Sequence, residues 1–395
     1  MRSRPQVCIE ECAATVSGAT PSTSDPSYWD GDICWATPKD LGELEGPFIS
    51  DTPRKITRIG LDSCAAAVLP PQSVLFSSRA PIGHVAINTV PMATNQGFKS
   101  FIPRSDRLIA GFLYHWLRSN RAYLESLGNG ATFKEVSKAV VSRLGIPLPP
   151  LPEQRRIADV LDRAEALRAK RRAALDEIEA LPQAIFRGLF GEATTQGRHP
   201  WVVLAECAEV VSVVAKGRKL DGRGAVEVPY LRVANVQAGY LDLSEVKNIE
   251  ALPSEVADLA LKAWDVLLTE GGDFDKLGRG ALFDGQVQGC IHQNHVFRVR
   301  TDASKLLPGY FHEYLQGPAA RAYFLRCAKR TTNLASINMT QLRSLPVPVP
   351  PIGLQLEFSR RVAAVEKLKV AQRASLAELD ALFASLQHRA LRGEL

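Results

Sequence analysis

The sequence lacks several features that would assign a protein to a broad class. No apolar run approaches the roughly 18 to 20 residues that a bilayer span needs. The start, Met-Arg-Ser-Arg-Pro, leads to Glu10 and Glu11, where a signal peptide would need an apolar stretch. The seven cysteines are odd in number and scattered, which argues against a disulfide framework. We therefore expect a soluble, cytoplasmic protein with reduced thiols.

Charge of one sign is also in short supply. The net charge is +6 over 395 residues, which permits a nucleic-acid partner without requiring one. Hydrophobic residues make up 46% and charged residues 23%, so the chain is globular and not disordered. At roughly 150 residues per domain, the length predicts two or three domains.

What the sequence does contain is an internal duplication. The Pro-rich segment at 146–151 matches the segment at 347–352, and each is followed by a glutamine, Gln154 or Gln355, and a long helical pattern. Cys12 recurs as Cys207 within matching apolar surroundings. Two copies therefore follow the same order of globular part, Pro-rich hinge and long helix. The predicted boundaries are 1–150 and 193–351 for the globular parts, and 151–192 and 352–395 for the helices.

The globular parts are predicted to mix α and β structure. Short β-branched runs bounded by Gly, Pro and Asn are typical of strands. These runs lie at 73–76, 83–87, 266–269 and 295–299. Aromatic and aliphatic residues recur at helical spacing over 111–127 and 309–328.

The two long helices carry apolar residues every three or four positions, which is typical of a coiled-coil seam. In the first helix the stripe is Ile157, Leu161, Ala164, Leu167, Leu175, Ile178 and Ile185. In the second it is Phe358, Val362, Val365, Leu368, Leu376, Leu379, Leu382 and Leu386. Arg171 and Gln372 interrupt the stripes, and Pro182 should kink or break the first helix. Because a globular part separates the helices in sequence, they can pair antiparallel.

This organisation resembles the specificity subunit of type I restriction–modification enzymes. The motif Ile-Pro-Leu-Pro-Pro-Leu-Pro-Glu-Gln at 146–154, opening a long charged helix, resembles that family's central conserved region. The segment at 17–22 followed by Tyr28 and Trp29 resembles the start of its target-recognition domains, and Gly128, Gly130 and Thr132 resemble the end of one. The second copy departs from the pattern, with Gly353 and Leu354 in place of Pro and Glu.

The resemblance implies an α/β (α+β) fold, with two globular target-recognition domains separated by an antiparallel pair of long coiled-coil helices. It implies a non-catalytic subunit that reads a bipartite, asymmetric DNA sequence. The helices would space the half-sites and dock two methyltransferase subunits, with restriction subunits joining the same complex. S-adenosylmethionine, ATP and Mg would then be bound by the partner subunits, and this chain would carry no cofactor or metal.

The residues themselves offer candidates for DNA contacts. Phosphates are bound by cations, and base edges are read by amide and guanidinium groups. Such groups cluster at strand ends and turns, where single residues are more often ordinary polar turn residues, so the clusters are stronger candidates than their members. The candidates are Ser77, Ser78, Arg79, Asn95, Gln96, Lys99, Thr132 and Lys134 in the first copy, and Lys216, Arg218, Lys219, Arg232, Asn235, Gln237, Lys276, Arg279, Gln293 and Asn294 in the second. The candidates for partner docking on the helices are Ile157, Leu161, Leu167, Leu175, Ile178, Val362, Val365, Leu376 and Leu379.

Signatures of other chemistry are incomplete. Cys290, His292 and His295 have no fourth ligand adjacent, so a structural role is favoured over a metal site. The glycine-rich segment 271–280 lacks the Gly-Lys-Ser/Thr ending of a phosphate-binding loop. Glu245-Val246-Lys247 loosely resembles a nuclease triplet that the first copy does not repeat, and the Asp/Asn-Pro-Pro-aromatic motif of amino-methyltransferases is not found.

Three rival interpretations remain. The first rival is the specificity arm of a type II-like restriction–methylation system. The second is a coiled-coil scaffold whose lobes bind proteins, and the third is an autonomous nuclease. The first would show one combined nuclease–methyltransferase in its gene neighbourhood. The second would lack the steep salt dependence of DNA binding. The third is disfavoured because no acidic site is duplicated.

Overall fold

The computed structural model of the chain describes residues 6–79, 81–130, 134–191, 199–212, 224–272, 277–330 and 335–392. It divides into two compact units. Unit 1 comprises Met1–Arg172 and Ala374–Leu395, and unit 2 comprises Ala173–Arg373. Each unit therefore holds one globular part and a portion of both long helices. Among the described residues, no helix is long and apolar enough to cross a membrane.

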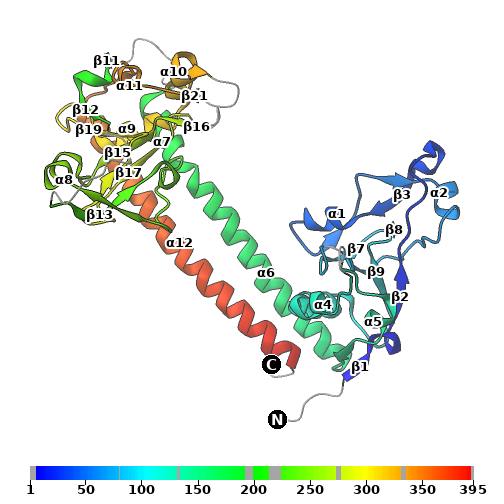
Figure 1. Cartoon of the computed structure of the whole chain (residues 1–395). Helices are drawn as coiled ribbons and strands as arrows, with labels where there is room; N and C mark the ends of the chain where they lie inside the picture. The colour runs from blue at the N-terminus through cyan, green and yellow to red at the C-terminus, as the bar shows by residue number, and fades with distance from the viewer. Residues whose placement is uncertain are drawn as a thin grey trace. The chain divides into compact units, whose positions relative to one another are not determined.

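The globular part of unit 1 is drawn in blue and cyan in Figure 1. It is built on a mixed five-stranded sheet with strand order β2-β9-β6-β7-β4. A three-stranded sheet, β5-β3-β8, and an antiparallel pair, β1-β10, complete its β structure. The strands are β1 (Gln6–Cys8), β2 (Ala13–Ser17), β3 (Trp29–Ala36), β4 (Phe48–Ile49), β5 (Lys55–Ile56), β6 (Val74–Phe76), β7 (Val85–Asn88), β8 (Met92–Thr94), β9 (Lys99–Pro103) and β10 (Gly145–Pro147). The helices of the globular part are η1 (Ile9–Glu11), η2 (Pro26–Tyr28), α1 (Pro38–Gly42), α2 (Arg58–Asp62), α3 (Ala110–Ser119), α4 (Arg121–Ser126) and α5 (Lys138–Ser142).

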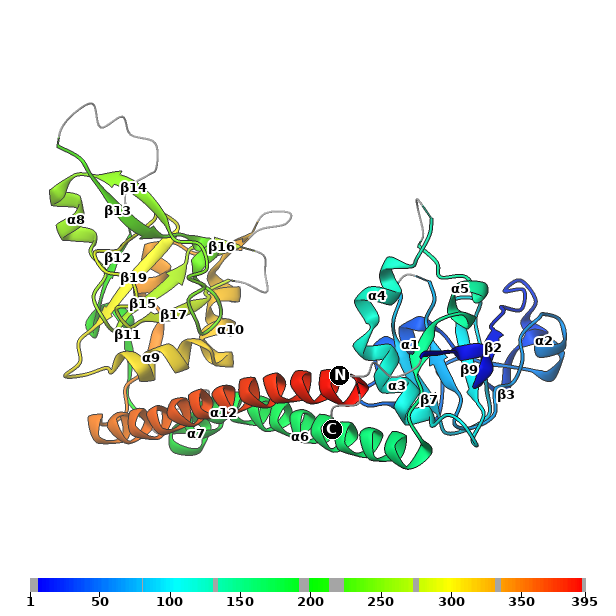
Figure 2. The same cartoon turned by 90° about the horizontal axis from the view of Figure 1, so that it is seen from below.

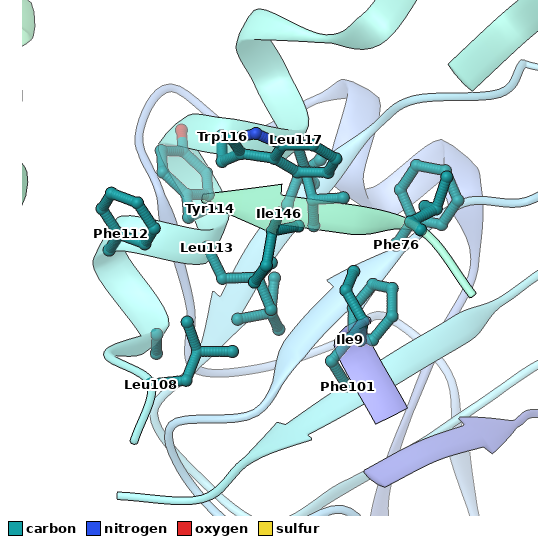
Figure 3. Packing of buried hydrophobic residues seen from close by; sticks show 14 of the residues in the cluster. Ile9, Phe76, Phe101, Leu108, Phe112, Leu113, Tyr114, Trp116, Leu117 and Ile146 are labelled. Atoms are coloured by element: carbon teal, nitrogen blue, oxygen red, sulfur yellow. The ribbon is translucent and has the colours of Figure 1, made fainter. Parts of the chain in front are cut away.

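The core of unit 1 forms where helix α3 packs on the five-stranded sheet (Figure 3). Phe112 and Leu113 from α3 lie within the same buried cluster as Phe76 and Phe101 from the sheet. Strand β6 is buried along its whole length because both of its faces are covered. The helix predicted over 111–127 is two helices, α3 and α4, because the chain turns at Asn120.

Unit 2 is organised around a four-stranded sheet of order β12-β19-β15-β17 (Figure 2). Its other sheets are β14-β13-β18, β16-β21-β20 and the pair β11-β22. The strands are β11 (Trp201–Val203), β12 (Ala208–Val211), β13 (Val226–Leu231), β14 (Lys247–Ala251), β15 (Asp265–Thr269), β16 (Gly271–Gly272), β17 (Gly280–Phe283), β18 (Ile291–His292), β19 (Val296–Thr301), β20 (Lys329–Arg330), β21 (Ala335–Ser336) and β22 (Pro346–Pro348). The helices are η3 (Leu204–Glu206), η4 (Val233–Asn235), α8 (Pro253–Leu259), α9 (Pro308–Leu315), α10 (Pro318–Cys327) and α11 (Met339–Arg343).

The two units repeat one topology, which confirms the duplication. β1 pairs antiparallel with β10 in unit 1, as β11 does with β22 in unit 2. β2 pairs antiparallel with β9, as β12 does with β19. β3 runs parallel to β8, as β13 does to β18. The equivalence therefore extends from the sequence anchors to the register of individual strands.

The long helices are α6 (Leu151–Glu179), α7 (Leu181–Phe190) and α12 (Ile352–Arg392). The break between α6 and α7 falls at Ala180, and Pro182 occupies the first turn of α7, where a missing N–H costs nothing. This confirms the break that Pro182 predicted. In unit 2, Glu179 contacts Lys369 and Phe186 contacts Phe358, so the helices run antiparallel.

One part of the predicted seam is wrong. Leu167, Leu368 and Leu382, assigned to the buried stripes, are 57%, 41% and 55% exposed. The neighbouring residues Arg168 and Lys369 turn inward instead, because their aliphatic stems pack in the seam while their charged ends are paired. An apolar pattern alone does not identify such positions.

In unit 1 the seam between α6 and α12 combines an ion pair with an aromatic contact. Arg168 Nε donates to Asp380 Oδ1 at 2.5 Å, and the Arg168 guanidinium lies 4.3 Å from the ring centre of Phe383. Arg172 also donates to Asp380, at 3.1 Å. In unit 2, Lys369 bonds Glu179 at 3.0 Å and Glu366 at 2.8 Å.

Candidate nucleic-acid interface

A buried glutamine attaches each long helix to its globular part. In unit 1, Gln154 accepts from the Ile109 amide at 2.9 Å and donates to the carbonyls of Arg107 and Pro149, both at 2.8 Å. In unit 2, Gln355 accepts from the Leu307 amide at 2.8 Å and donates to the carbonyls of Lys305 and Pro350, at 2.9 and 2.8 Å. Both glutamine side chains are fully buried. The duplicated glutamine therefore fixes how each helix leaves its globular part.

Equivalent loops meet at the end of the central strand in each unit. In unit 1 the Asn95 amide donates to the carbonyl of Ala36, the last residue of β3, at 3.0 Å. In unit 2 the Gln293 amide donates to the carbonyl of Leu231, the last residue of β13, at 2.9 Å. The predicted clusters Asn95–Gln96 and Gln293–Asn294 therefore occupy the same structural position. The residue after the strand is Thr37 in unit 1 and Arg232 in unit 2.

A second pair of loops borders these positions. In unit 1 the Ser78 amide donates to Gly97 O, and Ser78 O accepts from the Val136 amide, both at 2.8 Å. In unit 2 Glu270 makes the corresponding bonds, with His295 O at 2.9 Å and the Ile337 amide at 2.8 Å. Each unit thus presents one surface formed by loops that are far apart in the sequence.

The unit 1 surface contains a hollow of about 600 Å³. Three predicted candidates, Arg79, Asn95 and Gln96, line it together with Lys39, His84 and Glu43. Lys39 Nζ lies 3.6 Å from Glu43 Oε1. This concentration of cationic and amide groups suits phosphate and base-edge contacts.

Arg79 and Lys99 share a carboxylate beside this hollow. Arg79 donates to Glu135 Oε2 through Nε at 3.1 Å and Nη2 at 2.6 Å, and Lys99 Nζ donates to Oε1 at 3.2 Å. Partial burial of Glu135 opposes its ionisation, but the hydrogen bonds from Arg79 and Lys99 outweigh burial and lower its pKa. Lys134, next to this pair, is exposed.

Two unit 1 candidates lie in the interior. Ser77 Oγ donates to the Pro81 carbonyl at 2.7 Å, and Ser78 Oγ donates to the Gly97 carbonyl at 3.1 Å. Both side chains are fully buried, so they hold the loops in place and do not face a ligand in this conformation. Thr132 lies outside the described residues.

In unit 2 the loop after β13 has a polar scaffold. The buried Asn235 accepts from the Arg232 amide at 2.9 Å and donates to the carbonyls of Asp242 and Glu245, at 2.8 and 3.0 Å. Arg232 Nη2 donates to Glu245 Oε2 at 2.8 Å. Asn235 therefore shapes the loop, and the Arg232 side chain, 19% exposed, lies beside it against Glu245.

Gln237 and Arg279 form a second polar pair in unit 2. Arg279 Nη1 donates to Gln237 Oε1 at 2.9 Å, and Gln237 Nε2 donates to the Ala234 carbonyl at 2.8 Å. Arg279 is equivalent to the half-buried His84 of unit 1. The carbonyl of Arg279 accepts from the Thr269 amide, and the carbonyl of His84 accepts from the Ser77 amide, which has the corresponding position in unit 1. Gln293 and Asn294 are half-buried at the adjacent turn. The other candidates lie outside the described residues: Lys216, Arg218, Lys219 and Lys276.

Four further residues of these surfaces were not predicted from the sequence: Lys39, His84, Glu135 and Glu245. Lys39 was detectable, because it lies in a short helix directly after a strand end. Glu135 was not, because it lies 56 residues from Arg79 in the sequence and only the fold brings them together.

The Cys290, His292 and His295 group is not a metal cluster in this structure. His292 Nδ1 bonds the Val296 carbonyl at 2.8 Å, and His295 Nδ1 bonds Glu270 Oε2 at 2.7 Å. Burial lowers the pKa of His292 to about 4 and raises the pKa of Cys290 to about 12. No group of three or more His, Cys, Asp or Glu residues within the described ranges is placed to hold a metal ion.

Cys12 and Cys207 are core residues in their units. Each is buried and donates to a backbone carbonyl three residues earlier, Ile9 at 3.4 Å or Leu204 at 3.5 Å. Burial raises the pKa of Cys207 to about 11. Packing therefore accounts for both residues.

The docking candidates on the helices divide into three groups. Ile157, Leu161 and Val365 are buried, and Val362 packs against the core of unit 2. Leu175, Ile178, Leu376 and Leu379 are half-buried. Leu167 is exposed, as are Leu382 in unit 1 and Leu354, Leu356, Leu368 and Val370 in unit 2. These exposed residues form the accessible apolar surface of the helices, and Leu167 is the one among them that was predicted as a docking residue.

These features define a class of protein: a duplicated recognition protein in which two modules of one fold present different polar side chains at equivalent positions. A family profile described as "Type I restriction modification DNA specificity domain" matches residues 6–180. Residues 6–180, which include the globular part of unit 1 and helix α6, are therefore similar to the DNA specificity domain of type I restriction–modification systems.

Individual relatives agree with this assignment. The chain is 35% identical over 184 residues to the type I restriction enzyme MjaIX specificity subunit of Methanocaldococcus jannaschii, a match that covers 46% of this chain and 42% of that protein. It is 28% identical over 338 residues to the EcoKI specificity subunit of Escherichia coli K12, covering 80% of this chain and 73% of that protein.

Solved structures show the same fold. A chain from a study of assembly and conformational transition of the type I R-M system aligns with a TM-score of 0.66, at 19% identity, covering 100% of this chain and 99% of that chain. The HsdS subunit from Thermoanaerobacter tengcongensis aligns with a TM-score of 0.51, at 19% identity, covering 99% and 97%.

Proposed function

We propose that this chain is the DNA-reading subunit of a type I restriction–modification complex and that it recognises a bipartite, asymmetric sequence. The observation that carries the proposal is the pair of equivalent surfaces with unlike side chains. Where unit 1 has Thr37 and His84, unit 2 has Arg232 and Arg279. Different side chains on one scaffold read different base pairs, so the two half-sites would differ.

The proposed mechanism is binding without bond chemistry. Cations such as Lys39 and Lys134 would contact phosphates and set the position of unit 1 on the duplex. Guanidinium and amide groups, among them Arg79, Gln96 and Arg232, would read base edges in the major groove. Sequence discrimination then comes from a few side chains held by the loop scaffold.

The accessible leucines of the helices fit the docking of two methyltransferase subunits. Leu167 and Leu382 belong to unit 1, and Leu354 and Leu368 to unit 2. Exposed apolar side chains in such numbers on long helices are typical of protein interfaces. Restriction subunits would join the same assembly in the cytoplasm. S-adenosylmethionine, ATP and Mg would be bound by these partners, and this chain would be non-catalytic.

A comparison of DNA methylation in host cells with the gene intact and deleted tests the function most directly. We expect deletion to abolish one interrupted adenine-methylated motif with two unlike halves around a fixed gap. An unchanged methylation pattern, with the methyltransferase subunits confirmed as expressed, would contradict the proposal.

The protein-scaffold alternative is tested by salt. The affinity of the assembled complex for duplex containing the motif should fall linearly in log–log form as salt rises, by about 0.9 log units per log unit of salt for each phosphate contact. A scaffold would bind no duplex in this manner.

Replacing the loop 232–237 tests the assignment of the half-sites. Because this loop contains Arg232 and Gln237, the graft should change the recognised sequence of one half-site and leave the other half unchanged. If the graft leaves the recognised motif unchanged, this loop is not part of the DNA interface. The matched control is the same complex with residues 253–259 of helix α8 replaced by another helical sequence.

A further inference from the structure

Each recognition surface contains one carboxylate that bridges an arginine and a lysine. In unit 1 the group is Arg79–Glu135–Lys99, and in unit 2 it is Arg232–Glu245–Lys247. We call these the unit 1 triad and the unit 2 triad. Both contain an arginine that the proposed function assigns to base reading, and the inference below rests on that function.

The unit 1 triad holds its arginine in one orientation. Two guanidinium nitrogens of Arg79 bond the same oxygen, Glu135 Oε2, while Oε1 accepts from Lys99. The Lys99 side chain is 10% exposed, whereas Arg79 is 44% exposed. Glu135 therefore anchors an accessible arginine to an inaccessible lysine.

The unit 2 triad has the same composition with the opposite exposure, because Glu245 is 66% exposed whereas Arg232 is 19% exposed. Arg232 Nη2 lies 2.8 Å from Glu245 Oε2, and Lys247 Nζ lies 3.3 Å from Oε1. Hydrogen bonds from Arg232 and then Lys247 lower the pKa of Glu245. The carboxylate is thus ionised at neutral pH and offsets one of the two positive charges.

The two triads are built from non-equivalent positions. The positions of Arg79 and Glu135, which pair in unit 1, are occupied in unit 2 by Gly271 and Ser336. The position of Arg232, directly after strand β13, is occupied in unit 1 by Thr37, directly after strand β3. The two triads therefore do not derive from one triad that was copied in the duplication. Two independent occurrences beside a proposed reading arginine point to a shared requirement of the surface.

That requirement follows from the competition that a DNA-reading protein meets. Free cations bind phosphates of any sequence, and such contacts supply essentially all of the non-specific affinity. A carboxylate paired with each reading arginine lowers the local positive charge and so weakens non-specific binding to phosphates. It also keeps the guanidinium aligned for a base edge. The carboxylate is displaced only where a guanine offers two acceptors in the matching geometry.

We infer that Glu135 and Glu245 are specificity-determining latches, which hold a reading arginine and suppress its binding to non-cognate DNA. The latches are positioning residues, since they act through Arg79 and Arg232. Removing the charge of a latch should strengthen binding to non-cognate duplex and weaken discrimination without changing the recognised motif.

The test uses the complete chain in complex with its methyltransferase subunits and carries Glu245→Gln or Glu135→Gln. Affinity is measured by fluorescence anisotropy for a duplex with the motif found in host DNA and for a duplex with one half scrambled, over a range of salt. We expect non-cognate affinity to rise about three- to tenfold. The salt slope should steepen by about 0.9 in Glu135→Gln, where only Arg79 is accessible, and by up to about 1.8 in Glu245→Gln, where Lys247 is accessible as well. The ratio of cognate to non-cognate affinity should fall about tenfold.

Matched controls separate this effect from a general change of charge. Glu125→Gln in unit 1 breaks an exposed pair with Arg121 on α4, and Glu206→Gln alters an exposed residue of unit 2. Both make the same change in net charge away from the triads and should leave the ratio unchanged. Glu135→Gln leaves the poorly exposed Lys99 without its charged partner, so Glu245→Gln keeps the inference testable if that variant does not fold.

Three outcomes of this experiment would overturn the inference. A latch variant whose ratio matches wild type, or a control that lowers the ratio equally, overturns the inference. A variant that methylates a different base sequence also overturns it, because the glutamate would then itself be a base reader, for example of cytosine N4. Failure of the wild-type complex to discriminate between the duplexes would instead count against the proposed function.

Discussion

The buried glutamines offer the sharpest test of how the chain holds its helices. In Gln154→Leu the side-chain volume is nearly kept, while the Ile109 amide and the carbonyls of Arg107 and Pro149 lose their partners. A buried backbone group left unpaired costs about 1 to 3 kcal/mol, and part of that cost is relieved by relaxation or water. We therefore expect unit 1 to lose about 3 to 5 kcal/mol of stability.

Amide hydrogen exchange, resolved by peptide, measures this loss in each unit separately. Peptides covering 105–115 and 146–160 should exchange at least a hundredfold faster in Gln154→Leu, since about 1.4 kcal/mol corresponds to each factor of ten. The peptides of unit 2 should be unaffected, because the three bonds lie within unit 1. Gln355→Leu should give the reverse pattern.

The control is Arg155→Leu, at an exposed position one residue further along α6. It should leave exchange within a factor of about three. Equal exchange in Gln154→Leu and Arg155→Leu would refute the reasoning, because it would show that the three hydrogen bonds are replaced by water at no net cost.

Three further predictions follow from single contacts. Gly18→Ala should cost unit 1 about 1 to 3 kcal/mol and displace the Asn95 loop, since a Cβ would lie 2.0 Å from the Asn95 carbonyl oxygen; exchange of peptides covering 94–98 would report it. Arg168→Met and Asp380→Asn should show a coupling energy of about 1 kcal/mol in a double-mutant cycle followed by urea unfolding, and simple additivity would mean that the seam ion pair contributes nothing. His292 should contribute about 3 kcal/mol to the stability that unit 2 loses as pH falls from 6.5 to about 4, because the unfolded chain takes up a proton that buried His292 does not accept until its lowered pKa is reached. His292→Thr, which introduces the residue type at the equivalent position of unit 1, should remove this part of the pH dependence and leave the part due to His312, whose pKa burial also lowers to about 4. An unchanged profile would exclude the contribution of His292.

Much of the fold could be predicted from sequence. The duplication, the two long helices and their antiparallel pairing follow from repeated anchors and from apolar spacing, which are local properties of the chain. The strand predicted at 266–269 is β15 (Asp265–Thr269), and the break at Pro182 separates α6 from α7. Proline chemistry and β-branched runs act within a few residues, so the sequence states them directly.

The proposed recognition surfaces could be predicted only in outline. Arg79, Asn95 and Gln96 were identified as members of polar clusters, and the structure brings them to one hollow. Ser77, Ser78 and Asn235 have the same chemistry but are buried as loop scaffold. A polar residue at a strand end has no local signal that tells whether its side chain turns inward.

By itself, the sequence determined the architecture: two copies of a module, each joined by a proline-rich hinge to one of two helices. It also determined the glutamine that follows each hinge, although not the three hydrogen bonds that it makes. Tertiary structure alone decided which positions form the seam, as Arg168 and Lys369 replace Leu167 and Leu368 there. It alone joined Arg79 to Glu135 across 56 residues. The physical reason is the same in both cases, because burial and charge pairing depend on neighbours that only the folded chain supplies.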